Sequence, residues 1–269
     1  MDKKAILAVS FGTSYQDTLE RTIAAIEREL AAVFHDRILL RAFTSGMICR
    51  KLKERDGIVI PSPAQALEQL LGEGVTDVVI QPTHVINGAE YDKLMAQAEP
   101  FRDKFARLAV GAPLLTSIED YKAVADAVLE QLPEQQADTA QVFMGHGTEH
   151  YVNPSYTQLE YLFHDMGRKD IIIGTVEGYP GLEQVLRRLS ERPEVKKAQL
   201  HPLMVVAGDH ARNDLAGEEP DSWKSALENA GYQVACDLRG LGEFPGIQRL
   251  FAEHARQAAD NRDCSRSYR

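Results

Sequence analysis

The chain repeats one pattern of alternating strands and helices twice, and this repeat restricts its fold more than any other feature. In the first half, short apolar runs typical of buried strands alternate with amphipathic stretches at helical spacing. The predicted strands cover 5–10, 36–43, 77–81 and 109–115, and the predicted helices cover 15–33, 47–55, 62–72, 90–106 and 118–132. Strands that alternate with helices predict a parallel sheet with helices on both faces.

The pattern restarts after the polar segment 133–139. The predicted strands of the second half cover 141–144, 171–173, 198–206 and 232–237, and its predicted helices cover 157–166, 182–190, 221–230 and 245–259. A chain of 269 residues is long enough for two such domains. We therefore expect two similar Rossmann-like α/β domains, related by internal duplication, over residues 1–137 and 138–269.

The residues that follow equivalent strands also match between the halves. Ser-Phe-Gly-Thr at 10–13 corresponds to Gly-His-Gly-Thr at 145–148, Thr-Ser-Gly at 44–46 to Val-Glu-Gly at 176–178, and 81–90 to 201–210. At three of these equivalent positions the two halves carry different side chains. The second half has His146 where the first has Phe11, Glu177 where the first has Ser45, and His210 where the first has Glu90. Because strand ends of one sheet share a crevice, we expect the second trio to meet and to face Glu90 and Phe11 across an interdomain cleft.

Two imidazoles and one carboxylate form a mixed nitrogen and oxygen ligand set. Such a set suits Co(II), Fe(II), Ni(II) or Zn(II) and suits Mg(II) or Ca(II) poorly. The same groups could instead serve as acid and base, because an imidazole accepts protons near neutral pH. Phosphate transfer through an Arg-His-Gly motif is disfavoured, because Gly145 stands where the arginine would be.

The remaining histidines are weaker candidates. His150 and His201 lie near the expected site, whereas His84 either points into the cleft or packs. Three further histidines fall in or beside predicted helices and are expected at the surface: His35, His164 and His254.

Basic residues gather just after the junction at 44–47. Arg50, Lys51 and Lys53 lie within a predicted helix. They form either a solvated helix face or a patch that docks the carboxylates of an anionic ligand.

Charge and missing motifs exclude several classes of function. The net charge of -10 disfavours nucleic acid and anionic membranes as partners. No apolar run reaches the length of a transmembrane helix, and the N-terminal run reads as a strand rather than a signal peptide. Three widely spaced cysteines, at 49, 236 and 264, indicate no disulfide framework and favour the cytoplasm. Without GxxxxGK[ST] or GxGxxG we expect no nucleotide cofactor, and without GxSxG no α/β-hydrolase.

Five motifs together resemble the sirohydrochlorin cobalt chelatases of the anaerobic cobalamin pathway. They are Ser-Phe-Gly-Thr-Ser-Tyr at 10–15, Arg-Ala-Phe-Thr-Ser-Gly-Met-Ile at 41–48, His-Val-Ile-Asn-Gly at 84–88, Phe-Met-Gly-His-Gly at 143–147 and Val-Ala-Gly-Asp-His-Ala-Arg-Asn-Asp at 206–214. The resemblance runs from the first strand to about residue 247. It implies the class II chelatase fold and ATP-independent insertion of Co(II) into a tetrapyrrole, sirohydrochlorin.

The resemblance also implies roles for individual residues. It places metal binding on His146, Glu177 and His210, which are the residues that the internal repeat selects. It implicates Glu90, although the family has Asp where this chain has Ala89. We take His146 and Glu90 as catalytic residues and expect the substrate to contact Ser10, Phe11, Thr44, Ser45, Arg50, Lys51 and Lys53.

Two alternatives remain open at this point. The ligand set does not separate Co(II) from iron or nickel insertion into the same macrocycle. A protein that carries metal or tetrapyrrole without chemistry would use the same residues. The sequence also leaves open whether the chain forms a homo-oligomer.

Overall fold

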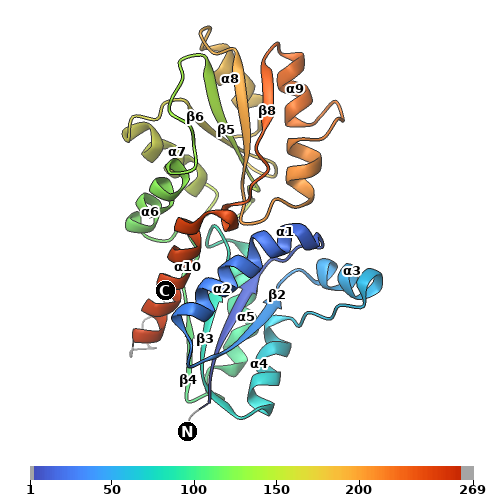
Figure 1. Ribbon diagram of the computed structural model, residues 1–269, viewed down its shortest axis with the longest axis vertical. Coiled ribbons are helices and arrows are strands. Elements are labelled where there is room, and N and C mark those ends of the chain that lie inside the picture. The colour runs from blue at the N-terminus through green and yellow to red at the C-terminus, as the bar shows by residue number, and fades with distance from the viewer. Residues whose placement is uncertain (1–2, 262–269) are drawn as a thin grey trace. The chain divides into compact units, whose positions relative to one another are not determined.

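The computed structural model describes residues 3–261. They form two compact units, shown in Figure 1. Among these residues, the first unit contains 3–116 and 247–261, and the second runs over Ser117–Gly246. Within the described residues, no helix combines the length and the apolar character needed to span a bilayer.

The first unit is built on a parallel four-stranded sheet in the order β2-β1-β3-β4. Its strands are β1 (Lys3–Ser10), β2 (Ile38–Phe43), β3 (Val75–Pro82) and β4 (Arg107–Val110). Its helices are α1 (Gln16–Arg21), α2 (Ile23–Val33), α3 (Gly46–Asp56), α4 (Pro63–Gly72), α5 (Ala89–Ala98), the 3-10 turn η1 (Glu99–Phe101) and most of α10 (Pro245–Asp260).

The second unit repeats this topology with a parallel sheet in the order β6-β5-β7-β8. Its strands are β5 (Thr139–Gly145), β6 (Ile171–Thr175), β7 (Lys197–Leu203) and β8 (Gln233–Cys236). Its helices are α6 (Ile118–Leu129), α7 (Ser155–Asp165), α8 (Leu182–Ser190), α9 (Trp223–Asn229), the π-helical turn η2 (Ala211–Leu215) and the 3-10 turn η3 (Leu241–Glu243). The predicted fold class, two similar parallel α/β units, is confirmed.

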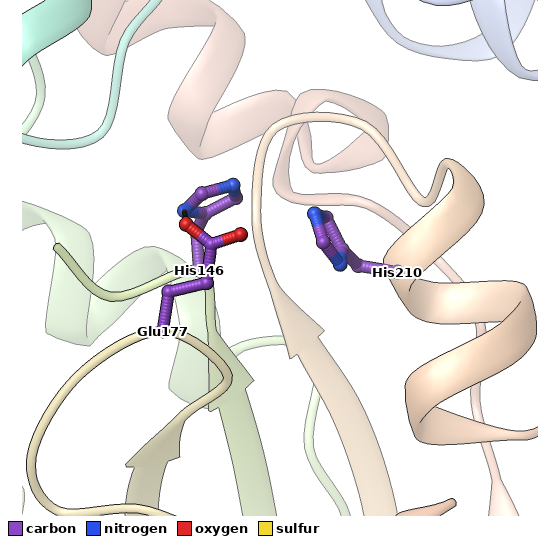
Figure 2. Close-up of side chains that lie close together, drawn as sticks. All are labelled: His146, Glu177 and His210. Atoms are coloured by element: carbon purple, nitrogen blue, oxygen red, sulfur yellow. Dashed lines mark ion pairs between the residues drawn. The ribbon is translucent and has the colours of Figure 1, made fainter.

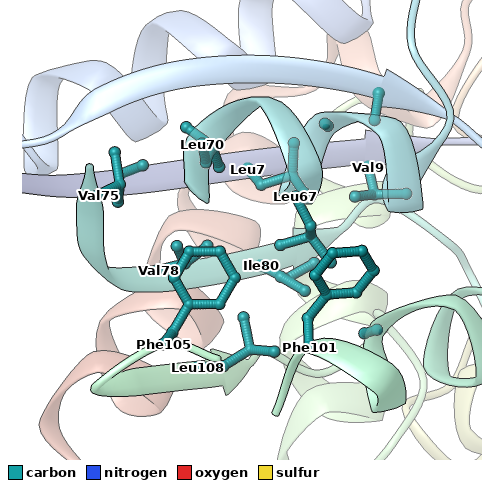
Figure 3. Packing of buried hydrophobic residues seen from close by; sticks show 14 of the residues in the cluster. Leu7, Val9, Leu67, Leu70, Val75, Val78, Ile80, Phe101, Phe105 and Leu108 are labelled. Atoms are coloured by element: carbon teal, nitrogen blue, oxygen red, sulfur yellow. The ribbon is translucent and has the colours of Figure 1, made fainter. Parts of the chain in front are cut away.

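Apolar strands packed under amphipathic helices hold each unit together. In the first unit, Leu67 and Leu70 of α4 pack on Leu7 of β1 and Val78 of β3, as Figure 3 shows. Each fully buried Leu contributes roughly 1.5–3 kcal/mol to the stability of the fold. The second unit has the equivalent cluster, in which α8 and α9 cover one face of β5. Both sheets are therefore rigid supports for the loops that follow their strands.

The sequence pattern predicts a domain boundary at residue 137. In the structure, the last helix of each half of the sequence instead belongs to the other unit. Helix α6, which ends the first half of the repeat, packs on α7 in the second unit. Helix α10, which ends the second half, packs in the first unit, where Nδ1 of His254 lies 3.0 Å from the carbonyl oxygen of Ala112. The guanidinium of Arg107 also donates to the carbonyl oxygen of Ala258 over 3.0 Å. These contacts join residues far apart in sequence, which a local pattern does not reveal.

A few elements differ from the predicted ones. The helix expected over 15–33 is interrupted at Thr22, whose hydroxyl donates to the carbonyl oxygen of Thr18 over 2.6 Å. The strand expected over 109–115 already ends at Val110. A Cβ at Gly111 would lie 2.0 Å from Oε1 of Gln81, so a larger residue there would require the Gln81 side chain to move. The sequence pattern did not predict the π-helical turn η2.

Candidate metal centre

Three candidate ligands follow three neighbouring strands of the second unit. His146 comes directly after β5, Glu177 follows β6, and His210 follows β7 and precedes η2. Because β5 is hydrogen-bonded to both β6 and β7, these residues share one edge of the sheet. Figure 2 shows the three side chains turned toward one another.

The backbone sets His146 and Glu177 side by side. The amide of Glu177 donates to the carbonyl oxygen of His146 over 2.8 Å, and the amide of Val176 donates to that of Gly145 over 3.0 Å. These two bonds continue the pairing of β5 with β6 beyond the strand ends. The resulting distance from Nδ1 of His146 to Oε2 of Glu177 is 3.7 Å.

Close backbone packing holds the loop of His146 against the loop of Glu177. Gly147 has a positive φ of 79°, which favours glycine. A Cβ at Gly147 would also lie 2.7 Å from the amide nitrogen of Gly178. Asn153 bridges the same two loops, because its Oδ1 accepts from the amide of Thr148 over 3.0 Å and its Nδ2 donates to the carbonyl oxygen of Tyr179 over 2.7 Å.

Hydrogen bonds fix which ring nitrogen each histidine offers. Nδ1 of His146 lies 2.9 Å from the carbonyl oxygen of Gly147, and Nδ1 of His210 lies 2.6 Å from Oδ2 of Asp214. Carbonyl and carboxylate oxygens only accept hydrogen bonds, so both Nδ1 atoms carry a proton. The lone pair of each neutral ring is then at Nε2. The two rings meet edge to face, with their centroids 4.8 Å apart.

The trio is close enough to share one metal ion. One ligand atom from each of His146, Glu177 and His210 lies within 4.8 Å of the other two. Ligands about 2.1 Å from a common ion lie at most about 4.2 Å apart, so small rotations of these partly exposed side chains would close the set. No other group of three or more His, Cys, Asp or Glu within residues 3–261 meets this criterion. The geometry supports a site for a metal that accepts two nitrogen ligands and one oxygen ligand.

The first unit carries a different polar group at its equivalent edge. Glu90, near the start of α5, lies beside Lys93, with Nζ 3.7 Å from Oε1. Lys93 also donates to the carbonyl oxygen of Thr44 over 2.6 Å. Within the described range, Oε2 of Glu90 and both ring nitrogens of His84 are buried without a hydrogen-bond partner. Burial lowers the pKa of His84 to about 4, although the nearby Glu90 acts in the opposite direction.

The expected substrate contacts fall into two groups. Phe11 is 43% exposed, and the basic side chains Arg50, Lys51 and Lys53 are exposed on α3. Three hydroxyl residues are buried instead, namely Ser10, Thr44 and Ser45. The hydroxyl of Ser10 accepts from that of Thr83 over 2.7 Å, and Ser45 caps α3 by accepting from the amide of Ile48. The hydroxyls of Ser10 and Ser45 therefore help to shape the first unit, whereas Oγ1 of Thr44 is buried without a hydrogen-bond partner within the described residues.

Two histidines occupy places other than those expected. His254, expected at the surface, is only 2% exposed, because α10 packs into the first unit. His201, expected near the site, is 6% exposed and belongs to the core of the second unit. Its ring stacks on Phe143 at 4.7 Å, and its Nε2 lies 2.8 Å from Oε1 of Gln141. Burial lowers the pKa of His201 to about 4.

Sequence reasoning missed two residues that organise the centre. Asn153 joins the loops of His146 and Glu177 from a turn between them, and no periodic pattern marks such a bridge. Asp214 bonds His210 from four residues further along. Its place in the motif at 206–214 was the available signal, because a carboxylate commonly supports a ligating histidine.

Comparison with known proteins gives matches along nearly the whole chain. A family model described as cobalt chelatase (CbiK) matches residues 4–260. A sirohydrochlorin cobaltochelatase of Salmonella typhimurium is 46% identical over 256 residues, covering 95% of this chain and 96% of that protein. The sirohydrochlorin cobaltochelatase CbiKC of Nitratidesulfovibrio vulgaris is 36% identical over 270 residues, covering 98% of this chain and 93% of that protein.

Solved structures share the fold at low sequence identity. SirB from Bacillus subtilis with Fe3+ has a TM-score of 0.67 at 17% identity and covers 96% of both chains. The sirohydrochlorin chelatase SirB from Bacillus subtilis subspecies spizizenii, in complex with cobalt, has a TM-score of 0.65 at 17% identity and covers 97% of both chains. The chelatase fold expected from the sequence motifs is thereby confirmed.

Proposed function

Because the chain belongs to the cobalt chelatase (CbiK) family, we propose that it inserts Co(II) into sirohydrochlorin, an early step of cobalamin synthesis. The observation that carries this proposal is the meeting of His146, Glu177 and His210 at one edge of the second sheet. Two relatives that align over nearly their full length are named for this reaction.

Metal capture is assigned to the second unit. Nε2 of His146, Nε2 of His210 and the carboxylate of Glu177 bind Co(II), a metal that accepts such mixed ligands. All three side chains are partly exposed, so the ion can reach them from solvent. Ligand exchange then moves Co(II) from these side chains to the pyrrole nitrogens.

Insertion releases two protons, because two pyrrole N–H groups become metal ligands. His146 is our choice for one acceptor, since its Nε2 lone pair becomes free once the bond to the metal breaks. Glu90 is proposed as a further proton relay, supported by its unpartnered Oε2. No step requires nucleotide, which agrees with the lack of a phosphate-binding loop motif in the sequence.

Substrate contacts are assigned mainly to the exposed residues of the first unit. Phe11 offers an apolar ring to the macrocycle, and Arg50, Lys51 and Lys53 offer positive charges to its carboxylates. The buried residues Ser10, Thr44 and Ser45 are assigned a supporting role, in which they hold the contacting side chains in position. The net charge of -10 makes this local positive patch necessary for an anionic substrate.

We also propose that the protein is located in the cytoplasm. Cys49 and Cys236 are free thiols, the form that a reducing compartment maintains. Sedimentation of the purified chain measures whether it forms a homo-oligomer.

One assay tests the function. Purified protein is mixed with sirohydrochlorin and Co(II) without nucleotide, and the absorption spectrum is followed against an enzyme-free control. We expect many turnovers per protein molecule. A stoichiometric spectral shift would instead identify a carrier, and faster insertion of Fe(II) or Ni(II) would reassign the metal.

A pair of variants ties the assay to the site. His146→Ala should abolish insertion and leave the circular dichroism spectrum unchanged, because a residue in a strand-end loop contributes little core packing. His35→Ala removes an exposed histidine of the first unit and should retain full activity. Undiminished insertion by His146→Ala would refute the site.

A further inference from the structure

The two histidines of the metal centre are supported by unequal partners. Nδ1 of His146 donates to the neutral carbonyl group of Gly147, whereas Nδ1 of His210 donates to the charged carboxylate of Asp214 over 2.6 Å. Hydrogen bonds to charged groups are shorter and roughly twice as strong as those between neutral groups. His210 is therefore held more firmly than His146.

The local fold brings Asp214 to His210. His210 immediately precedes the π-helical turn η2, in which the amide of Ala216 donates to the carbonyl oxygen of Ala211 over 3.3 Å. Asp214 lies within this turn, on the side of His210. Such wide turns are rare and occur frequently at functional sites.

Asp214 contributes little else to the fold. Its side chain is 46% exposed, and within residues 3–261 its carboxylate makes no ion pair other than that with His210. Leu215 and Ala211, the buried residues of η2, anchor the turn to the second unit. Loss of the carboxylate should therefore leave the unit folded.

We propose that Asp214 is a positioning residue that makes His210 the anchoring ligand of the metal and leaves His146 as the ligand released first. This inference rests on the proposed function and deepens it. The carboxylate fixes the His210 ring with Nε2 toward the metal and increases electron donation from that nitrogen. Among the described residues, Nδ1 of His146 has no such hydrogen bond to a carboxylate, because the oxygen of Glu177 nearest to it lies 3.7 Å away and Glu177 is itself a proposed ligand. The bond from His146 to Co(II) is therefore the weaker one.

The order of release matters for the chemistry. When the bond from Nε2 of His146 to Co(II) breaks and a bond from a pyrrole nitrogen forms, the lone pair on Nε2 is free. That lone pair then takes the proton which the pyrrole nitrogen loses. The ion stays bound to His210 during this exchange and remains next to the macrocycle.

The test measures binding of Co(II) alone to the full-length protein. Asp214→Ala should raise the Kd for Co(II) about 10- to 100-fold, the usual effect of losing a partner of a ligating histidine. Asp214→Asn keeps an oxygen that accepts from Nδ1 and should bind Co(II) with an intermediate Kd. The visible absorption of bound Co(II) should change in Asp214→Ala, because the ligand geometry changes.

Steady-state kinetics provide a second readout. In Asp214→Ala the KM for Co(II) should rise, whereas the KM for sirohydrochlorin should stay unchanged. Glu219→Gln removes an exposed carboxylate from the loop after η2 and is the matched control, with an unchanged Kd for Co(II). Thermal unfolding of each variant confirms that the fold is intact.

The outcomes separate this inference from the proposed function. If Asp214→Ala binds Co(II) as tightly as the unchanged protein and with the same absorption spectrum, the role of Asp214 is overturned while insertion activity stands. If the unchanged protein binds Co(II) in an Asp214-dependent way yet turns over no macrocycle, the proposed function fails and the role of Asp214 is supported.

Discussion

The amide of Glu177 donates a hydrogen bond to the carbonyl oxygen of His146 over 2.8 Å, and in the first unit the amide of Ser45 donates to the carbonyl oxygen of Phe11 over 3.2 Å. The two bonds occupy the same place in the repeated fold. The loops that follow equivalent strands therefore have the same backbone pairing in both units but carry different side chains. The second unit presents metal ligands where the first presents an aromatic ring and a hydroxyl.

Glycine at position 147 should be essential for this arrangement. In Gly147→Ala the new Cβ would meet Thr175 and Gly178 at 2.7 Å, and the residue would hold an unfavourable positive φ. We expect loss of Co(II) binding and destabilisation by about 1–3 kcal/mol. Gly208→Ala is the control, because its Cβ meets nothing within 4 Å. Isothermal titration with Co(II) and urea unfolding measure both effects, and equal behaviour of the two variants would contradict the steric argument.

The bridge made by Asn153 can be dissected with two substitutions. Asn153→Ala removes both hydrogen bonds between the loops and should lower stability by about 1–3 kcal/mol and weaken Co(II) binding. Asn153→Asp keeps an acceptor for the amide of Thr148 but places a negative oxygen against the carbonyl of Tyr179. We expect it to be at least as harmful as the alanine variant. Recovery of wild-type Co(II) affinity in Asn153→Asp would show that the bond to Tyr179 is unimportant.

Metal binding should be independent of Glu90, because all three candidate ligands belong to the second unit. Glu90→Gln should leave the Kd for Co(II) unchanged and slow insertion about 100-fold or more, as expected for loss of a proton-transfer group. Glu68→Gln, an exposed carboxylate on α4, should alter neither quantity. A raised Kd in Glu90→Gln would make Glu90 a metal ligand instead.

The basic residues of α3 should govern substrate affinity. Reversal of charge at Arg50, Lys51 and Lys53 should raise the KM for sirohydrochlorin several-fold, with the Kd for Co(II) unchanged. The effect should shrink as salt is added, because exposed charges are screened. Lys122→Glu on α6 serves as a control for the change in net charge. An unaltered KM would leave these residues as a solvated helix face.

Stability should fall in mild acid because of His201. Burial lowers its pKa from 6.5 to about 4, so between these values the unfolded chain binds the proton more readily than the folded chain. This part of the stability is complete above pH 6.5 and is lost as the pH falls toward 4. At pH 5 the loss amounts to about 2 kcal/mol.

One variant isolates the contribution of His201 to the loss of stability in acid. His201→Gln introduces the residue that the first unit carries at the equivalent position, Gln81 before Pro82. Urea unfolding at pH 7.5 and pH 5 should show a smaller loss for His201→Gln than for the unchanged protein. The same loss in both proteins would assign the acid sensitivity to other groups, such as the buried His84.

Much of the fold and the candidate metal trio could be predicted from the sequence. Alternating apolar runs specify strands and helices locally, and parallel strands in one sheet necessarily end at one edge. The matched junctions then identified His146, Glu177 and His210 without any knowledge of side-chain positions. Backbone hydrogen bonds confirm the pairing of Phe11 with His146 and of Ser45 with Glu177 in the two repeats.

Only the tertiary structure decided the features that depend on contacts between residues distant in sequence. The exchange of α6 and α10 between the units, the burial of His254 and the bridge at Asn153 all arise from long-range packing. The pairing of His210 with Asp214 depends on a wide turn that no hydrophobic period indicates. Periodicity reports which face of an element is apolar, but it does not report which other element covers that face. The choice of covering element follows from the free energy of the whole packed unit.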